Sequence, residues 1–335
     1  MLSYVERGPL VPGGSREARW MRAVGVRERN GRPEILQARQ PEPGEGEVLV
    51  RVVAAGLNPL DWKIAEGMLE SLVPYDFPLV MGADFAGTVE SCGPEAYRFT
   101  PGEQVFGHVV SEPVGGGTYA EYVVVNEAGS IARAPTSIPL TTAAGAPTAG
   151  MTALGIMDSA ALHSYASVLI IGAAGGVGTF LTQLASARGL RVVAATHGHD
   201  RARMGAFGAA SAIDVRTTDL AAAVREEYPG GVDALVDLGS TAAAEFARNT
   251  ALVRDGGVAV STLDAASLDA LHGRRIEGIN YHLAASAELL ERLGEEIDSG
   301  PLTVPIEVEV PLDEAPGAVA RNRAGGARGK TVLLT

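Results

Sequence analysis

Over the first third of the chain, apolar and polar residues alternate in short runs that Gly and Pro separate. The runs MRAVGV, EILQAR and EVLVRVVAAGLN, which begin at residues 21, 34 and 47, are divided by an Asn-Gly and a Pro-Glu-Pro-Gly turn. Alternation of this kind between turn residues is typical of strands. Because TYAEYVVV (118–125) alternates in the same way, we predict a β-rich domain for this region.

The pattern then changes to an alanine-rich, helix-like segment (141–160), after which strand-like and helix-like runs alternate from Val168 to Thr262. Alternating units of this kind build a parallel sheet. Two later strands of the sheet are expected at VDALVDL and GVAVST. Ser240 and Thr262 stand at their carboxyl ends, where open α/β sheets bind ligands, so both are candidate cofactor-binding residues.

We therefore predict an α/β fold with two domains. A Rossmann-type, doubly wound parallel sheet is expected at 140–282, and the β-rich domain at 21–139 and 283–335, because two short strands, PIEVEV and KTVLLT, follow the sheet. A chain of 335 residues is long enough for two cores of ordinary size. Residues 1–20 lack the apolar segment of a signal peptide, and we expect them to form a flexible extension.

The stretch VLIIGAAGGVGTFLTQLASA (168–187) indicates a nucleotide site. Its apolar run, glycine cluster and amphipathic run predict a strand, a tight turn and a helix, which together can cradle a dinucleotide pyrophosphate. Ala173 stands where the first glycine of G-x-G-x-x-G belongs, so an ordinary glycine-rich turn is the alternative. The residues expected to face the pyrophosphate are Ala174, Gly175, Gly176 and Val177.

The next predicted strand, RVVAAT, ends without the acidic residue that NAD-binding units usually place on the ribose. Thr196 ends the strand, His197 and Arg201 follow, and a guanidinium group suits the 2′-phosphate of NADPH. The sequence therefore favours NADPH over NADH. In the alternative, Arg201 and Arg203 are solvated charges on the next helix, and Asp200 neutralises one of them.

Composition excludes several classes of protein. The chain is 46% apolar and 20% charged, and no apolar run approaches the roughly 18 residues of a membrane span. Its net charge of −13 argues against nucleic acid or an anionic membrane as the main partner. The single cysteine, Cys92, permits neither an internal disulfide nor a cysteine-rich zinc site. We expect a cytoplasmic protein that acts on a small molecule.

Further motifs occur in order from about Met21 to the end of the chain: GLNPLDWKIAEG, PLVMGADFAGTVESCG, PGEQVFG, TAGMTAL and the terminal GKTVLL. Together with the glycine-rich turn they resemble the zinc-independent quinone oxidoreductases of the medium-chain dehydrogenase/reductase superfamily. NPLDWK is especially similar to the NADPH-dependent quinone or 2-alkenal reductases. The resemblance implies a GroES-like catalytic domain split around a Rossmann domain, with the active site in the cleft between them.

The resemblance also bears on metal binding. Zinc-dependent relatives carry a cysteine where this chain has Asn58, a histidine where it has Ala83, and four cysteines around a structural zinc. A catalytic zinc needs about three protein ligands, so we expect no metal. The implied reaction is hydride transfer from NADPH to an already activated acceptor, either a quinone or the β-carbon of an α,β-unsaturated carbonyl.

The candidate catalytic residues lie in NPLDWK, where several relatives have a tyrosine at the position of Lys63. Asn58 is expected to orient the nicotinamide ribose or the acceptor oxygen, and Lys63 to stabilise an enolate or donate to it. Alternatively, Lys63 is a surface residue paired with Asp61 or Glu66. Asp61 is the third catalytic candidate, with a helix cap as its alternative.

Thr152 and Lys330 complete the candidate cofactor contacts. The resemblance puts Thr152 near the carboxamide end of the cofactor, whereas a helical hydroxyl also bonds back to the preceding turn. Lys330 is expected to reach the cofactor phosphates from the other domain, with a solvated loop charge as the alternative.

Two further expectations concern partners and activity. The strand at 257–262 would be an exposed sheet edge in a monomer, and relatives pair it with a second subunit, so a homodimer is expected. Besides a quinone or enone reductase, the sequence leaves open a biosynthetic enoyl-thioester or tailoring reductase, and a non-catalytic NADPH-binding sensor.

Overall fold

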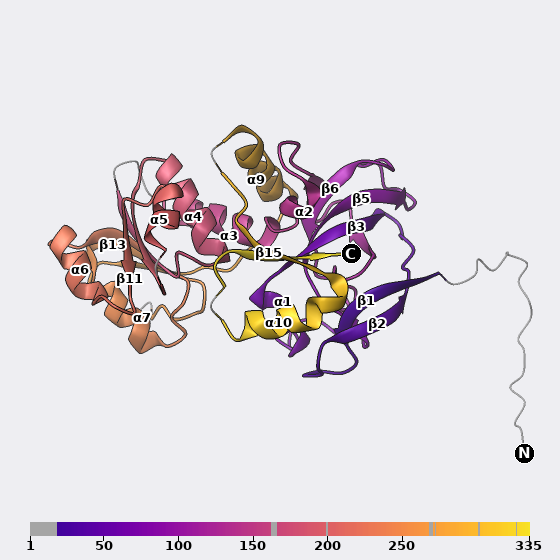
Figure 1. Ribbon diagram of the computed structural model, residues 1–335, viewed down its shortest axis with the longest axis horizontal. Coiled ribbons are helices and arrows are strands. Elements are labelled where there is room, and N and C mark those ends of the chain that lie inside the picture. Colours follow the sequence, from indigo (N-terminus) through magenta and orange to yellow (C-terminus); the bar gives the residue numbers. More distant parts are fainter. Residues whose placement is uncertain are drawn as a thin grey trace, which may run out of the picture.

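The computed structural model describes residues 19–335 except 162–165, 199, 268–270, 272, 301 and 326. The predicted extension therefore lies almost entirely outside the described residues, as does His199. Figure 1 shows two bodies along the long axis of the molecule, with β-rich structure at one end and a sheet flanked by helices at the other.

The β-rich body contains two sheets. Their strands are β1 (Trp20–Val26), β2 (Glu34–Arg39), β3 (Glu47–Leu57), β4 (Leu79–Val80), β5 (Asp84–Cys92), β6 (Gln104–His108), β7 (Tyr122–Asn126), β8 (Ile131–Arg133), β15 (Ile306–Pro311) and β16 (Lys330–Leu334). The smaller sheet has the order β2-β1-β4, and the larger runs β15-β16-β3-β5-β6-β8, with β7 paired to β3. Because β15 and β16 come from the end of the chain, the C-terminus completes a sheet begun at the N-terminus, as PIEVEV and KTVLLT predict.

The other body is built on a six-stranded parallel sheet. Its strands are β9 (Ser167–Ile171), β10 (Arg191–Thr196), β11 (Ser211–Asp214), β12 (Val232–Asp237), β13 (Val253–Ser261) and β14 (Glu277–Asn280). The order β11-β10-β9-β12-β13-β14 reverses between β9 and β12. Strands β9, β10 and β12 are almost entirely buried, as expected when helices cover both faces of a sheet. The predicted doubly wound α/β fold is confirmed.

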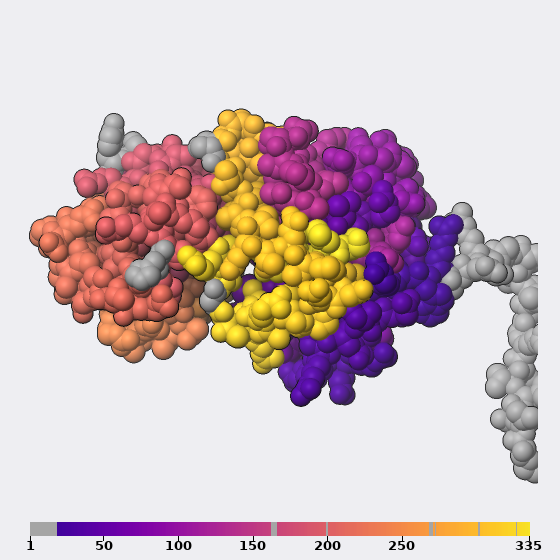
Figure 2. Space-filling model, in the orientation of Figure 1, coloured from indigo at the N-terminus to yellow at the C-terminus, as the bar shows by residue number. Residues whose placement is uncertain are grey.

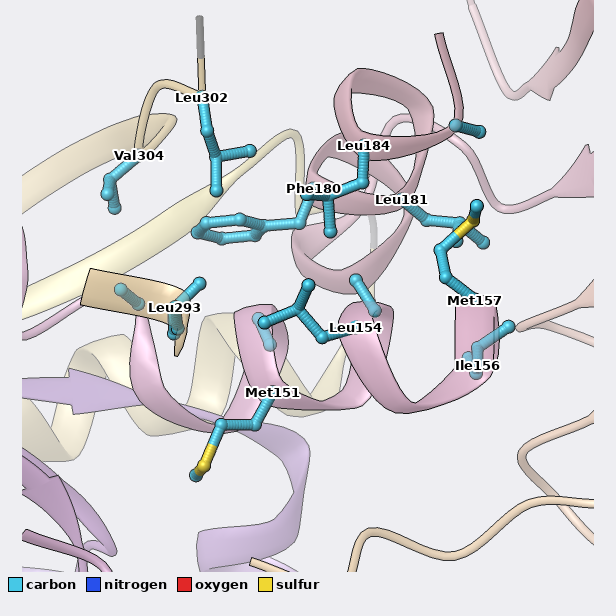
Figure 3. Packing of buried hydrophobic residues seen from close by; sticks show 14 of the residues in the cluster. Met151, Leu154, Ile156, Met157, Phe180, Leu181, Leu184, Leu293, Leu302 and Val304 are labelled. Atoms are coloured by element: carbon cyan, nitrogen blue, oxygen red, sulfur yellow. The ribbon is translucent and has the colours of Figure 1, made fainter. Parts of the chain in front are cut away.

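The described helices are α1 (Pro59–Ala65), α2 (Leu140–Ala143), α3 (Pro147–Ser159), α4 (Gly176–Ala187), α5 (Arg201–Ala206), α6 (Leu220–Glu227), α7 (Ala243–Thr250), α9 (Ala287–Ser299) and α10 (Ala315–Arg323). Most of them cover the parallel sheet or join the two bodies, whereas α1 and α10 pack together on the β-rich body (Figure 1). Figure 3 shows Leu154 of α3, Phe180 of α4 and Leu293 of α9 packed together. The same apolar cluster includes Phe106 of β6 and Ile170 of β9, so the two bodies share one core. Figure 2 shows the C-terminal segment, in yellow, between them on the visible face.

Some predicted elements differ from the structure. The edge strand of the parallel sheet is β14, and the predicted edge, 257–262, lies in β13 with a neighbour on each side. The last strand of the sheet, β14, was not predicted because its sequence, EGIN, is short and weakly apolar. The strand predicted at 118–125 starts at Tyr122, and the helix predicted at 141–160 is divided because Pro147 starts a new helix. Among the described residues, no helix has both the length and the apolar character needed to cross a bilayer.

Candidate active site at the junction of the two bodies

The predicted glycine-rich turn joins β9 to α4. Gly172 has a φ of +78°, which favours glycine, and Gly175 caps the helix that starts with Gly176 and the half-buried Val177. A Cβ atom on Gly178 would lie 2.4 Å from the Gly172 carbonyl oxygen, so helix and turn leave no room for a side chain there. The first N–H groups of a helix have no acceptor within it. This tight turn at a helix start therefore fits a dinucleotide pyrophosphate.

Three more predicted cofactor residues lie at the carboxyl ends of the parallel strands. The Ser240 backbone N–H donates to Asp237 Oδ1 (2.8 Å), and the Thr262 backbone N–H donates to the Asp237 carbonyl oxygen (3.4 Å). Thr196 is buried, and its hydroxyl donates to the Gly198 carbonyl oxygen (3.2 Å). The structure thus brings these residues to the carboxyl ends of the strands, around the point between β9 and β12 where the strand order reverses. Open α/β sheets bind ligands at this point.

A pocket of about 340 Å³ opens at the end of β10 and is lined by Thr196, Gly198 and Arg201, among others. Arg201 is the first residue of α5, and its side chain is exposed. His197 is also exposed and does not line this pocket. Of the two predicted 2′-phosphate residues beyond the strand, the structure therefore places Arg201 at the pocket.

Asp200 is buried and pairs with two other arginines. Its Oδ1 lies 3.4 Å from Arg203 Nε and accepts a hydrogen bond from Arg328 Nη2. Arg203 Nη2 also donates to the carbonyl oxygen of Ala174, a buried residue of the glycine-rich turn (3.0 Å). Asp200 thus neutralises Arg203, as the alternative stated, whereas Arg201 has no ion-pair partner in the part of the chain that the structure describes.

A second polar cluster lies on the β-rich side of the junction, around the fully buried carboxylate of Asp84. Asp84 accepts hydrogen bonds from Asn58 Nδ2 (2.8 Å) and from the backbone N–H (3.1 Å) and hydroxyl (2.5 Å) of Thr148. His108 Nδ1 lies 3.2 Å from the same carboxylate. Burial alone would raise the pKa of Asp84, but the hydrogen bond from His108 and the charge of Lys330 hold it below its usual value. Asp84 is therefore an ionised anchor at neutral pH.

Lys330, the first residue of β16, belongs to this cluster and is only 3% exposed. Its ammonium donates to the Leu57 carbonyl oxygen (3.1 Å) and to Asn58 Oδ1, and it lies 4.0 Å from Asp84 Oδ2. Burial lowers the pKa of Lys330, and the charge of Asp84 opposes that effect. The alternative of a solvated loop charge is therefore wrong for Lys330.

Asp61, in the first turn of α1, is also fully buried. Its Oδ2 accepts hydrogen bonds from the Tyr119 hydroxyl (2.6 Å) and the Asn58 backbone N–H (2.7 Å), so it does cap the helix. Its Oδ1 has no hydrogen-bond partner among the described residues. Burial, only partly offset by these hydrogen bonds, raises the pKa of Asp61 to about 7.

Lys63 is the predicted catalytic residue that the structure leaves outside the cluster. Its Nζ lies 5.7 Å from the centre of the Trp62 ring. Neither ion pair considered for it is formed, because Asp61 is in the buried cluster and Glu66 pairs with Arg323 (2.6 Å). A role for Lys63 in the reaction has no geometric support here.

Helix α3 contributes one predicted and one unpredicted residue. Thr152 Oγ1 donates to the Thr148 carbonyl oxygen (2.6 Å), which is the intrahelical bond of the alternative interpretation. Its contact with the carboxamide of a cofactor stays a prediction. Thr148 itself stands in TAGMTAL, but nothing in that motif indicates that its N–H and hydroxyl meet Asp84.

Four residues of the site had no assigned role in the sequence analysis: His108, Tyr119, Thr148 and Arg328. They reach their partners across long sequence separations, up to 128 residues for Arg328 and Asp200. Only Arg328 carried a usable signal, because it precedes Lys330 by two residues and so reaches the same junction.

The donor set does not fit a catalytic zinc. At two of the positions where zinc-dependent relatives have ligands, this chain has a methyl group, on Ala83, and an amide, on Asn58, that is already bonded to Lys330 and Asp84. Over the residues that the structure describes, no three or more His, Cys, Asp or Glu side chains form a group that could hold a metal ion.

Comparison with known proteins agrees with this architecture. Residues 44–136 match the family model "Alcohol dehydrogenase GroES-like domain", and residues 207–333 match "Zinc-binding dehydrogenase". The chloroplastic quinone-oxidoreductase QR1 of Triphysaria versicolor is 30% identical over 307 residues, covering 88% of this chain and 91% of that protein. The 2-methylene-furan-3-one reductase of Solanum lycopersicum is 29% identical, covering 88% and 73%. The structure of mycobacterial Rv1454c complexed with NADPH is similar with a TM-score of 0.80 and 26% identity, covering 94% and 100%.

Proposed function

Since the chain belongs to the quinone oxidoreductase-like medium-chain dehydrogenases/reductases, we propose that it is an NADPH-dependent reductase that acts, without zinc, on a quinone or an α,β-unsaturated carbonyl. The observation that carries this proposal is the position of Lys330. Its Cδ lies 3.2 Å from where a Cβ atom on Gly176 would stand, while its ammonium bonds Asn58. The nucleotide cradle and the buried polar cluster thus form one site.

The residues of this site divide the work between binding and positioning. The glycine-rich turn binds the pyrophosphate, and Arg201 binds the 2′-phosphate. The Asn58 amide, fixed on both sides, orients the nicotinamide end or the acceptor oxygen. When bound, NADPH supplies the hydride. An acceptor that is already conjugated needs only polarisation and positioning, which these groups provide without a Lewis acid. Asp61, whose pKa burial raises to about 7, exchanges its proton near neutral pH beside Asn58.

Arg201→Ala is expected to weaken NADPH binding by about 1–3 kcal/mol and to leave NADH binding almost unchanged. The reason is that an exposed guanidinium at the pocket can pair only with the extra phosphate of NADPH. Titration calorimetry with both nucleotides measures the difference. Arg248→Ala, at an exposed arginine in the last turn of α7, which packs against β12 and β13, is the matched control. Equal losses for NADPH and NADH would contradict the assignment.

The proposed function is tested by NADPH and NADH consumption with three acceptors: a 1,4-benzoquinone, a 2-alkenal and a short enoyl thioester. We expect turnover with the quinone or the alkenal and a preference for NADPH. Turnover with the thioester alone would favour the biosynthetic alternative. Tight NADPH binding without turnover of any acceptor would favour the non-catalytic sensor.

A further inference from the structure

The Lys330 side chain occupies a passage bordered by Gly145 and Gly176, and Gly329 precedes it in the chain. Gly329 has a φ of +139°, and a Cβ atom there would lie 2.5 Å from the Pro305 carbonyl oxygen. Cβ atoms on Gly145 and Gly176 would lie 3.4 Å and 3.2 Å from atoms of the Lys330 side chain. The Lys330 side chain therefore fits between α4 and the β-rich body, and its ammonium lies in the interior.

The ammonium at the end of this passage has a defined set of partners. It donates to the Leu57 carbonyl oxygen (3.1 Å) and to Asn58 Oδ1, and Asp84 Oδ2 lies 4.0 Å away, beyond hydrogen-bond distance. Two of the three N–H donors of the ammonium are thus used on consecutive residues at the start of α1. Its charge is directed at Asn58 and Asp84.

These contacts fix the orientation of the Asn58 amide. Its Oδ1 accepts from Lys330, and its Nδ2 donates to Asp84 (2.8 Å). A flipped amide would set its NH₂ group against the ammonium and its oxygen against the carboxylate, and both contacts are repulsive. Because Asn58 is 4% exposed, water cannot replace either partner easily. Lys330 and Asp84 therefore determine which edge of the amide remains for a ligand.

We propose that Lys330 is a positioning residue that acts through Asn58, and that it does not bind the cofactor phosphates. This proposal rests on the proposed function, since it assigns Lys330 to the nicotinamide end of the same site. It replaces the sequence-based expectation that Lys330 reaches the phosphates.

The test is a double-mutant cycle with Lys330→Met, Asn58→Ala and the double variant. Lys330→Met is expected to lower kcat by at least about tenfold, as loss of a group that orients a site residue typically does. In the Asn58→Ala background the same change is expected to lower kcat by less than about twofold, because the residue that Lys330 positions is gone. A merely structural role would lower kcat equally in both backgrounds and would overturn the proposal.

A binding measurement separates the two roles without turnover. The probe is 2′-phospho-ADP, which retains the pyrophosphate and the 2′-phosphate of NADPH but lacks the nicotinamide riboside. Lys330→Met is expected to bind this probe within about twofold of the parent protein and to bind NADP⁺ more weakly. Weaker binding of 2′-phospho-ADP would assign Lys330 to the phosphates and overturn the proposal. Lys330→Gln enters the same measurements if the methionine variant does not fold. An inactive parent protein would contradict the proposed function instead, and the two failures are thus distinguishable.

Discussion

An Asp84→Ala variant is expected to lose about 3–5 kcal/mol of folding free energy, because removing one partner of a buried charged cluster leaves the others uncompensated. Asn58 Nδ2 and the Thr148 N–H and hydroxyl would lose their acceptor, and the Lys330 ammonium would lose its counter-charge. Asn58 and Lys330 are buried, so water cannot take the place of the carboxylate. NADPH turnover should fall with the loss of order at Asn58.

Asp298→Ala is the matched control for this variant. Asp298 also accepts hydrogen bonds from backbone N–H groups, those of Thr136 and Ser137, but its side chain is exposed. Its loss is expected to cost only about 0.5–2 kcal/mol. Denaturant unfolding of the parent and both variants gives the two differences. A cost for Asp84→Ala no larger than that for Asp298→Ala would show that Asp84 does not anchor the cluster.

Asp61→Asn is expected to change the pH dependence of stability. Folding raises the pKa of Asp61 from 3.8 to about 7, so the folded state favours the protonated form. The resulting stabilisation is complete below pH 4 and is lost as the pH rises through 7, where the buried group ionises. Asn stays neutral at all pH values and removes this loss. Between pH 5 and pH 8 the variant should therefore gain about 2–3 kcal/mol relative to the parent.

The measurement is denaturant unfolding of the parent and the variant at pH 5, 6, 7 and 8. Comparison with the parent cancels the contributions of groups that do not interact with Asp61, whereas the charges of Asp84 and Lys330 help to set its pKa. Asp255→Asn, at an exposed aspartate, is the control for the substitution itself. If the stability difference between Asp61→Asn and the parent stays constant from pH 5 to pH 8, Asp61 is ionised throughout and holds no proton at neutral pH.

Local sequence patterns predicted the parts of the fold that local physics determines. Apolar β-branched runs located β9, β10 and β12, because strands buried on both faces need them. The glycine-rich turn was also predicted from local sequence, because its close packing requires glycine: a side chain at Gly178 would clash with the turn. Strand β14 was missed because EGIN carries no such pattern and is placed by pairing with β13.

The candidate site was predicted less completely, because its contacts join distant parts of the chain. Asn58 was identified from its motif, but its partner Lys330 is 272 residues away. Nothing in the sequence around Lys330 reveals that its side chain lies against Gly145 and Gly176. The same holds for Tyr119, which meets Asp61 across 58 residues. Patterns within a segment cannot report such pairs, so charge and burial at the site became visible only in three dimensions.

The central claim is that this junction supports reduction by NADPH without zinc. It is tested most directly by measuring NADPH turnover with a quinone before and after dialysis against a strong chelator, with the zinc content determined on the same samples. We predict that the rate is unchanged and that zinc stays far below one equivalent, because the chain offers Asn58 and Ala83 where zinc ligands would stand. A rate that falls in proportion to the zinc removed, and returns when zinc is added, would contradict the account.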